Sequence, residues 1–233
     1  MNLLNDSFPR FYGRRKGRKL SKAGNSYLQE GEKYFIKKEN FSQDFLKLFR
    51  DVTTDKIVLE IGFGNGDNLV QAAKSSTKDI FIGADPFLNS TVQCVQKLIK
   101  YNLNNVKIWP DDIKKIINFF PKNSITEVKI LFPDPWPKSK HKTRRLIQTE
   151  FIEQLSRILI NNGVVTIATD HHVLKSWILE KFNFNNNFEW TANDPIDWRR
   201  RPLDCFETKY EKKAYKESRK PSWFLFKKIK SKI

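Results

Sequence analysis

The most informative segment of the chain is IVLEIGFGNG, residues 57–66, in which a short apolar run leads directly into a glycine-rich turn. A continuous apolar run of this length is typical of a strand that is buried on both faces of a parallel sheet. Glycine adopts positive φ readily and lets a ligand approach the backbone, so Gly62, Gly64 and Gly66 are expected to line a binding site. In open α/β sheets such a site lies beyond the carboxyl ends of the strands.

Beyond this segment, apolar runs alternate with amphipathic segments along most of the chain. The expected elements are strands at 57–61, 80–84, 106–109, 128–132 and 164–169, and helices at 69–74, 90–101, 113–120 and 143–159. This alternation predicts a parallel sheet with helices on both faces. Two late strands, 188–190 and 223–226, are expected to pair antiparallel at the sheet edge. The predicted fold class is therefore α/β and Rossmann-like, a mostly parallel sheet with an antiparallel C-terminal edge.

The domain organisation is suggested by a change of composition near residue 40. Residues 1–39 are polar and basic, and we expect them to form a partly flexible arm that could order on a partner. Apolar residues recur at helical spacing from Phe41 to Phe49, which predicts a helix over about 40–50. No internal repeat or long linker interrupts residues 40–233, so we expect them to form a single domain.

The charge of the chain is strongly positive and unevenly distributed. The net charge is +17, from 43 Lys and Arg against 26 Asp and Glu. Three segments carry the excess: 1–39 at +6, 138–145 at +5 and 198–233 at +9. Clustered cations with aromatic residues between them favour a nucleic-acid partner, although solvated surface lysines are the simpler alternative.

Several classes of protein are excluded by what the sequence lacks. No apolar run approaches the ~20 residues that a membrane-spanning helix needs, and the N-terminus has no apolar export signal. Cys94 and Cys205 are too far apart for a disulfide framework or a zinc-finger pattern. His171 and His172 are adjacent but have no cluster of other metal ligands around them, so no metal is expected. We therefore expect a cytoplasmic protein.

The spacing of the glycines distinguishes between two nucleotide cofactors. A dinucleotide-binding turn reads G-x-G-x-x-G, which would place a third glycine at position 67, where this chain has Asp67. The turn is instead flanked by Glu60 and Asp67, which would repel a pyrophosphate. A sulfonium cation that carries an α-amino group would be attracted, so the turn favours S-adenosylmethionine as the cofactor.

Acidic residues also follow the second and third expected strands. Asp85 can accept hydrogen bonds from both ribose hydroxyls of such a cofactor. Either Asp111 or Asp112 can accept from the adenine amino group, and we favour Asp112. Asp112 is equally well placed to be a helix N-cap, and the two roles are compatible.

The segment after the fourth expected strand is PDPWPKSKHKTRR, residues 133–145. Its three prolines stiffen the loop, and a rigid loop favours precise placement of a substrate. Its C-terminal part contains five cations in eight residues. DNA amino-methyltransferases carry a related motif at this place, but there a second proline stands where this chain has Trp136, so that class fits poorly.

These motifs resemble those of the bacterial tRNA (guanine-N7)-methyltransferase family, which modifies guanine 46 in the variable loop of tRNA. The resemblance runs from about Phe41 to the C-terminus, and its most specific element is PDPWPK at 133–138. Thr169-Asp170 and the TKYE segment at 208–211 support it. The resemblance implies a class I methyltransferase fold, with S-adenosylmethionine as methyl donor and tRNA as substrate.

The same resemblance implies roles for individual residues, with Asp134 as the catalytic residue. The donor contacts would be Glu60, Asp85, Asp112 and Asp134. The substrate contacts would be Lys138, Asp170, Thr208, Lys209, Tyr210 and Glu211. The chain departs from the family at three places. His171 replaces the usual aromatic residue after Thr169-Asp170, and Asp85 stands where Glu is frequent. Residues 203–207 separate Arg201-Pro202 from the TKYE segment, which follows almost directly in many members of the family. Because of that last departure, Glu207 is an alternative to Glu211 as the substrate contact in the tail.

The implied chemistry needs no strong base. Guanine N7 has a free lone pair, so the enzyme mainly has to align it with the methyl group. The product base is cationic, and the carboxylate of Asp134 could stabilise the developing charge. Two alternatives remain open: a methyltransferase of the same fold with another substrate, and an RNA-binding protein without activity. The latter would not need Glu60, Asp85 and Asp134. The sequence does not distinguish a monomer from a homodimer.

Overall fold

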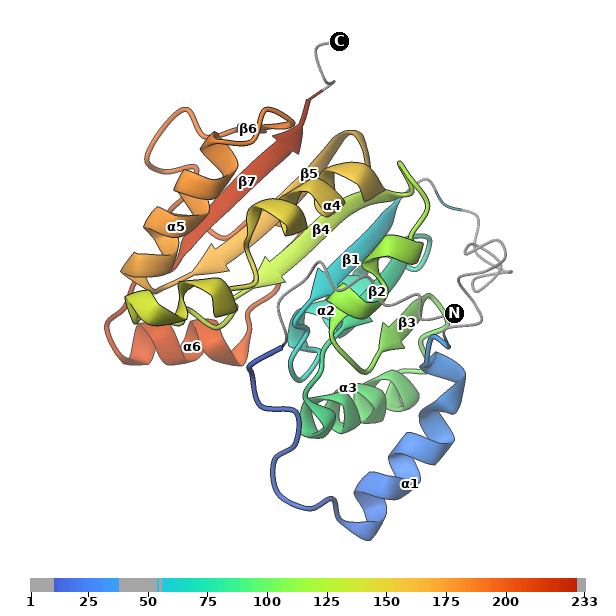
Figure 1. Cartoon of the computed structure of the whole chain (residues 1–233). Helices are drawn as coiled ribbons and strands as arrows, with labels where there is room; N and C mark the ends of the chain where they lie inside the picture. Colours follow the sequence, from blue (N-terminus) through green and yellow to red (C-terminus); the bar gives the residue numbers. More distant parts are fainter. Residues whose placement is uncertain (1–10, 38–53, 55, 230–233) are drawn as a thin grey trace, which may run out of the picture. The chain divides into compact units, whose positions relative to one another are not determined.

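The computed structural model describes residues 11–37, 54 and 56–229 (Figure 1). The helix predicted over 40–50 lies outside the described residues. No helix in the described part of the chain is both long and apolar enough to cross a membrane.

The chain divides into two compact units. The first, called here the N-terminal unit, comprises Arg14–Pro121 together with Leu203–Thr208. The second, the C-terminal unit, comprises Met1–Gly13, Lys122–Pro202 and Lys209–Ile233.

The N-terminal unit contains a parallel sheet with the strand order β3-β2-β1. In chain order its elements are α1 (Lys22–Glu30), the 3₁₀ helix η1 (Gly31–Tyr34), β1 (Ile57–Ile61), α2 (Asp67–Ser75), β2 (Ile80–Ala84), α3 (Leu88–Lys100), β3 (Val106–Trp109), and the 3₁₀ helices η4 (Ile113–Lys115) and η5 (Ile117–Phe119). Every residue of β1 and β2 is buried, which explains why both strands are continuous apolar runs. The three strands predicted here are confirmed.

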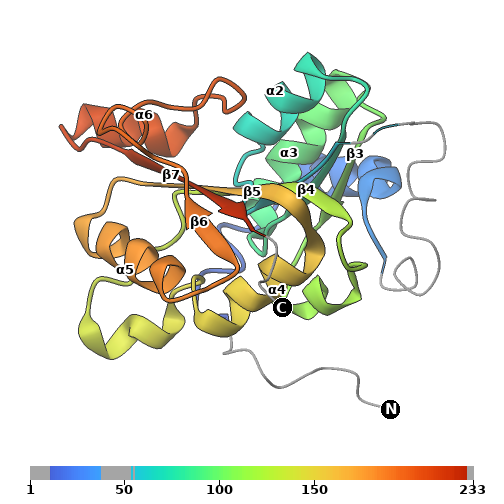
Figure 2. The same cartoon turned by 90° about the horizontal axis from the view of Figure 1, so that it is seen from above.

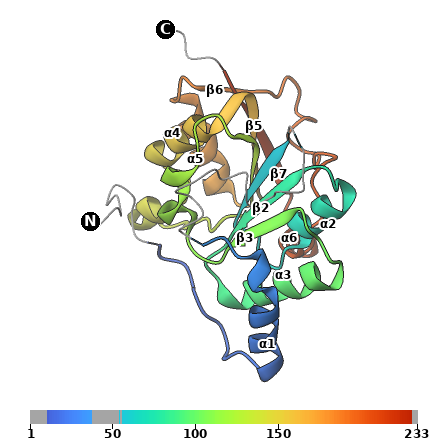
Figure 3. The ribbon, with the colours of Figure 1, turned by 90° about the vertical axis from the view of Figure 1, so that its right-hand side faces the viewer.

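Two helical features of this unit differ from the predictions. The helix predicted over 113–120 is wrong, because Ile116 leaves the helical conformation (φ −126°, ψ −12°) and separates η4 from η5. Helix α1 was not predicted; Ser21 caps it by accepting a hydrogen bond from the backbone of Gly24 at 3.1 Å. Figures 1 and 3 both show α1 beside α3.

The C-terminal unit contains a mixed sheet with the strand order β4-β5-β7-β6. Its elements are β4 (Ile125–Leu131), the 3₁₀ helix η6 (Ser139–Arg144), α4 (Thr149–Ile158), β5 (Leu159–Thr169), α5 (His172–Asn183), β6 (Phe188–Trp190), α6 (Lys209–Lys216) and β7 (Ser222–Lys228). Strand β4 pairs parallel with β5, whereas β7 pairs antiparallel with both β5 and β6. The predicted antiparallel C-terminal edge is therefore confirmed.

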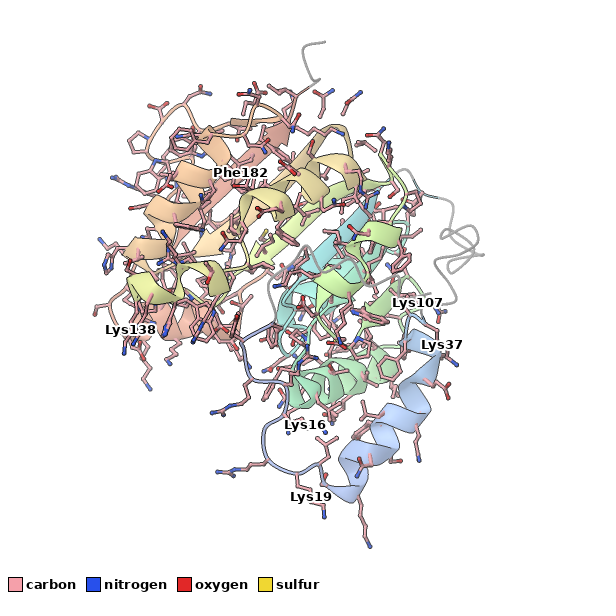
Figure 4. The ribbon with its side chains drawn as sticks, in the orientation of Figure 1. Lys16, Lys19, Lys37, Lys107, Lys138 and Phe182 are labelled. Atoms are coloured by element: carbon pink, nitrogen blue, oxygen red, sulfur yellow. The ribbon has the colours of Figure 1, made fainter. Side chains whose placement is uncertain are left out.

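Helices cover both faces of these strands. Figure 2 shows α4 and α5 on one side of β5 and β7, and α6 on the other. On the α5 side, Phe182 stacks on Phe226 with the ring centroids 3.9 Å apart; Phe182 is labelled in Figure 4.

Three element starts in this unit were predicted incorrectly. Strand β4 begins at Ile125 and not at residue 128. Strand β5 begins at Leu159 and not at residue 164, and Asn162 has a positive φ (64°) inside this longer strand. Helix α4 begins at Thr149 and not at Thr143, because residues 139–144 form η6 and Arg145 is extended.

Candidate active site

The glycine-rich turn after β1 requires glycine at three positions. Gly62, Gly64 and Gly66 have φ values of 81°, 55° and 75°, which other residues rarely adopt. A Cβ atom on Gly66 would lie 2.6 Å from the sulfur of Cys94, so this glycine is also required by packing. A Cβ on Gly62 would have no atom within 4 Å. The turn is therefore tightly packed at Gly66 and open at Gly62, just beyond the end of β1.

Glu60 is a buried carboxylate at the end of β1. It is 2% exposed, and its Oε2 accepts a hydrogen bond from Nδ2 of Asn68 at 2.7 Å. Asn68 belongs to the first turn of α2, and its Oδ1 accepts from the backbone N–H of Phe206 at 2.7 Å. Asn68 was not predicted as a site residue, since nothing in the local pattern indicates a partner 138 positions away.

Asp85 connects the glycine turn to the end of β2. Its Oδ2 accepts from the backbone N–H of Gly64 at 2.8 Å, and its Oδ1 accepts from that of Phe87 at 2.8 Å. The predicted residues Gly64 and Asp85 are thus brought into direct contact. A carboxylate fixed by two backbone donors is preorganised to receive further hydrogen bonds from a ligand.

Asp111 and Asp112 follow β3 and have different surroundings. Asp112 is buried and caps η4 by accepting from the backbone of Lys114 at 3.0 Å, and burial raises its pKa. Asp111 accepts from Arg15 at 2.5 Å and Lys115 at 2.6 Å. Burial would raise the pKa of Asp111, but these hydrogen bonds and that from the backbone of Asp112 lower it overall. The N-cap role considered for Asp112 is thus observed.

The basic arm is attached to the start of α3 near this point. The carbonyl of Arg15 accepts from the backbone of Leu88 at 2.9 Å, and the backbone N–H of Gly17 donates to Oδ1 of Asn89 at 2.6 Å. Figure 4 shows Lys16 and Lys19 pointing away from this segment. The arm therefore has a defined backbone here while its lysines are exposed to solvent.

In the C-terminal unit, the PDPWP loop is held by Arg145. Arg145 is 5% exposed, and its guanidinium donates to the carbonyls of Pro135 at 3.2 Å and Trp136 at 3.1 Å. It also lies over the ring of Trp177 in α5, 4.6 Å from the centroid. Trp136 has a positive φ of 39°, which is an unfavourable conformation for a bulky residue. The hydrogen bond from Arg145 to the Trp136 carbonyl helps to hold this conformation. Arg145 therefore fixes the loop, whereas the sequence pattern placed it in a basic cluster.

Asp134 and Lys138 are presented by this loop. Both side chains reach solvent, while the protein atoms packed around the Asp134 carboxyl partly desolvate it and raise its pKa. Figure 4 shows Lys138 at the surface, pointing outward. Arg144 lies over the rings of both Trp136 and Tyr12, at 5.1 Å and 4.8 Å from their centroids.

Two further predicted substrate contacts in this unit are each paired with an arginine. Asp170, directly after β5, accepts from Nε of Arg219 at 2.7 Å. Glu211 in α6 is 2% exposed and accepts from Arg201 at 2.9 Å, whereas Glu207 is exposed. The two arginines were not predicted as site residues; Arg201 compensates the buried carboxylate of Glu211, whereas Asp170 is only partly buried.

The remaining predicted substrate contacts lie around the start of α6. Thr208, in the N-terminal unit, is buried, whereas Lys209 and Tyr210 in α6 are exposed. Among the described residues there is no group of three or more His, Cys, Asp or Glu side chains that could hold a metal ion.

The sheet order and the glycine-rich turn are those of the class I methyltransferase fold. Among solved structures, the 16S rRNA methyltransferase KamB is similar, with a TM-score of 0.56 and 11% identity over 80% of this chain and 93% of that one. SMU.1697c from Streptococcus mutans, solved in complex with SAH, has a TM-score of 0.51 and 16% identity over 83% of this chain and 99% of that one. These similarities establish the fold.

The sequence is also similar to a named family over most of its length. Residues 54–223 match the family described as "Putative methyltransferase". A tRNA (guanine-N(7)-)-methyltransferase from Rhodospirillum rubrum is 34% identical over 93% of this chain and 87% of its own length. Another, from Ruegeria pomeroyi, is 34% identical over 94% of both chains. The chain belongs to the tRNA (guanine-N7)-methyltransferase family.

The residues of the N-terminal unit fit S-adenosylmethionine, the cofactor of this class. Glu60 and Asp85 are negatively charged acceptors at the ends of adjacent strands, which suits an ammonium group and two ribose hydroxyls. The space beside Gly62 would be filled by any side chain. These acceptors therefore match a ligand in which a cationic amino acid is joined to a nucleoside, and they do not match a pyrophosphate.

Proposed function

We propose that this protein transfers a methyl group from S-adenosylmethionine to N7 of guanine 46 in the variable loop of tRNA. The observation that carries this proposal is the similarity over 93–94% of the chain to relatives named for guanine-N7 methylation. The Asp134 loop after β4 supports it, because this loop is the most specific motif that the chain shares with that family.

The residues of the N-terminal unit bind the methyl donor in this proposal. Glu60 accepts hydrogen bonds from the α-ammonium group, Asp85 accepts from the ribose hydroxyls and Asp112 accepts from the adenine amino group. Gly62, Gly64 and Gly66 let the backbone approach the cofactor. When bound, S-adenosylmethionine supplies a methyl carbon that its sulfonium group makes electrophilic.

The residues that act on the substrate lie in the C-terminal unit, except Thr208, which belongs to the N-terminal unit. Asp134 contacts the donor and, as the catalytic carboxylate, stabilises the positive charge that develops on the guanine ring during methylation. Lys138 and Asp170 contact the RNA, as do Thr208, Lys209, Tyr210 and Glu211. The burial of Glu211 and its pairing with Arg201 favour Glu211 over the exposed Glu207 for the tail contact.

The same proposal covers the organisation and the partners of the chain. Residues 40–233 act as one methyltransferase domain, and residues 1–39 form a basic arm that contacts tRNA. The enzyme works in the cytoplasm on tRNA and requires no metal, because attack by the N7 lone pair needs only alignment and charge stabilisation.

The decisive experiment is methyl transfer from labelled S-adenosylmethionine to unmodified tRNA, followed by chemical cleavage at N7-methylguanine. We expect label in the variable loop at guanine 46, and none in a matched tRNA with adenine at that position. Equal transfer to both tRNAs would mean that the methylated base is not guanine 46. No transfer to any tRNA by protein that binds S-adenosylhomocysteine would refute the proposed substrate.

A further inference from the structure

A single buried amide joins two parts of the N-terminal unit to which the proposed function assigns different ligands. Asn68 is 1% exposed and bonds Glu60 through Nδ2 and the backbone of Phe206 through Oδ1, both at 2.7 Å. These partners define the orientation of the amide, because only its nitrogen can donate to a carboxylate and only its oxygen can accept from N–H.

On the Glu60 side, the amide fixes a carboxylate without neutralising it. A hydrogen bond to an ionised acceptor is stronger than one between neutral groups, so Asn68 holds Glu60 firmly in place. An arginine or lysine in the same place would cancel the negative charge that the ammonium group of the donor requires. Asn68 is therefore the chemically suitable residue for presenting Glu60 to a cation.

On the Phe206 side, the amide holds the tail segment 203–208. The ring of Phe206 packs against the core cluster that contains Phe63 and Leu69. Two positions later lies buried Thr208, the first residue of the proposed tRNA-binding motif. The backbone that leads to this motif is thus hydrogen-bonded to the same side chain that orients the donor-binding carboxylate.

We propose that Asn68 is a positioning residue that couples binding of the methyl donor to binding of tRNA; this inference rests on the proposed function. A donor bound at Glu60 stabilises the observed orientation of the Asn68 amide. That amide holds Phe206, and Phe206 holds the start of the tRNA-binding segment. Because coupling is reciprocal, each ligand increases the affinity for the other by the same factor.

The test is a thermodynamic cycle on the full chain. The Kd for S-adenosylhomocysteine is measured with and without unmodified tRNA, and the Kd for tRNA with and without S-adenosylhomocysteine. We expect each ligand to tighten the other by at least about fivefold in the wild type. In Asn68→Ala we expect the coupling factor to fall towards 1, and the Kd for S-adenosylhomocysteine to rise about tenfold as one charge-assisted hydrogen bond is lost.

Asn105 offers a matched control at the other end of α2. It is 4% exposed, and its Nδ2 donates to the carbonyls of Ala73, Ser76 and Asp79 at 3.0–3.1 Å. Asn105→Ala removes the same group from a similarly buried site, so it should lower the melting temperature but leave the coupling factor unchanged. An equal loss of coupling in both variants would mean that general loosening is responsible, and would overturn the inference.

Asn68→Asp separates the two hydrogen bonds of the amide. An aspartate can still accept from Phe206, but it places a second negative charge beside Glu60. The two carboxylates repel each other or share one proton, so Glu60 is displaced or loses its charge. We therefore expect a larger rise in the Kd for S-adenosylhomocysteine than in Asn68→Ala, with tRNA binding in its absence unchanged. If Asn68→Ala does not fold, this variant provides the test. Unchanged coupling in a folded Asn68 variant, or no coupling in an active wild type, would overturn the role of Asn68. A wild type that binds both ligands but does not methylate tRNA would refute the proposed function instead.

Discussion

Asp134 is the residue on which the proposed chemistry depends most directly. Its carboxylate stands in a loop of three prolines, and partial burial already raises its pKa. Asp134→Asn keeps the shape but removes the charge, so we expect kcat to fall by about 10²–10³, the usual effect of losing one preorganised electrostatic contact. Single-turnover methylation measures this loss. A kcat within a factor of about three of the wild type, in protein with an unchanged melting temperature, would contradict the catalytic role.

Variants of Arg145 test whether the conformation of the PDPWP loop determines the rate of methyl transfer. Without the guanidinium, the carbonyls of Pro135 and Trp136 lose their donors, and buried polar groups without partners are costly. We expect Arg145→Ala to lower kcat by about 10–100-fold through misplacement of Asp134. Arg145→Lys should recover only part of this rate, because an ammonium group cannot serve both carbonyls and lie flat on Trp177.

The neighbouring Arg144 provides the control for this loop variant. Its guanidinium lies over the rings of Trp136 and Tyr12, whereas the loop carbonyls are bonded by Arg145, so we assign Arg144 to the surface that would meet RNA. Arg144→Ala should raise KM for tRNA more than it lowers kcat. If both variants changed the same kinetic constant to the same extent, the distinction between anchor and RNA contact would be wrong.

The turn between β1 and α2 shows how two glycines in one element can have different functions. Gly66→Ala would force a positive φ on alanine and push its Cβ to 2.6 Å from the sulfur of Cys94. Gly62→Ala imposes a similar φ, but its Cβ enters open space. We expect unfolding free energies lower by about 1 kcal/mol for Gly62→Ala and about 2–4 kcal/mol for Gly66→Ala. Chemical denaturation measures both.

The binding of the methyl donor should show the opposite order. The Gly62→Ala side chain would occupy the open space in which the cofactor is proposed to lie, so it should raise the Kd for S-adenosylhomocysteine by at least about tenfold. In folded Gly66→Ala protein the rise should be smaller. Equal effects of the two variants on both stability and binding would show that the turn acts only as a structural connection.

The strands could be predicted from the sequence far better than the helices. Buried parallel strands such as β1 and β2 are uninterrupted apolar runs, and short runs of this kind between turn residues are characteristic of such strands. Helices α1 and α6 contain few apolar residues, so no run of apolar positions marks them in the sequence. Helix α4 was expected to begin too early because the apolar spacing continues into a segment whose Arg145 contacts the preceding loop.

The candidate site could be predicted only in part for a similar reason. Glu60 and Asp85 stand at strand ends, so their position was enough to select them, whereas Asp134 was selected through the family resemblance. The residues that hold them do not follow a local pattern. Asn68 is hydrogen-bonded to the backbone of Phe206, and Glu211 to Arg201, and such pairings are set by tertiary structure. The family resemblance contributed the roles, while the structure contributes the contacts that make those roles physically possible.

For the molecule as a whole, the net charge of +17 leads us to expect that binding to tRNA, the proposed substrate, depends strongly on salt. Helix α6 is a clear place to test this dependence. Its buried residues are Glu211 and Ala214, and Arg201 pairs with the only acid of the helix. The outward residues are Lys209, Tyr210, Lys212, Lys213, Tyr215 and Lys216. A face of lysines with exposed tyrosines can bind phosphates and also stack on bases.

We therefore expect Lys212→Gln/Lys216→Gln to weaken tRNA binding and to make it less sensitive to salt. Each lost phosphate contact should lower the slope of log K against log salt by about 0.7–0.9, so the pair should lower it by about 1.5. The control is Lys78→Gln/Lys122→Gln, which removes the same charge from exposed lysines just before β2 and β4. Those positions lie at the amino ends of parallel strands, opposite to the end at which this fold binds ligands. Equal slopes for the two double variants would mean that tRNA senses only the net charge, and that the α6 face has no specific part in binding.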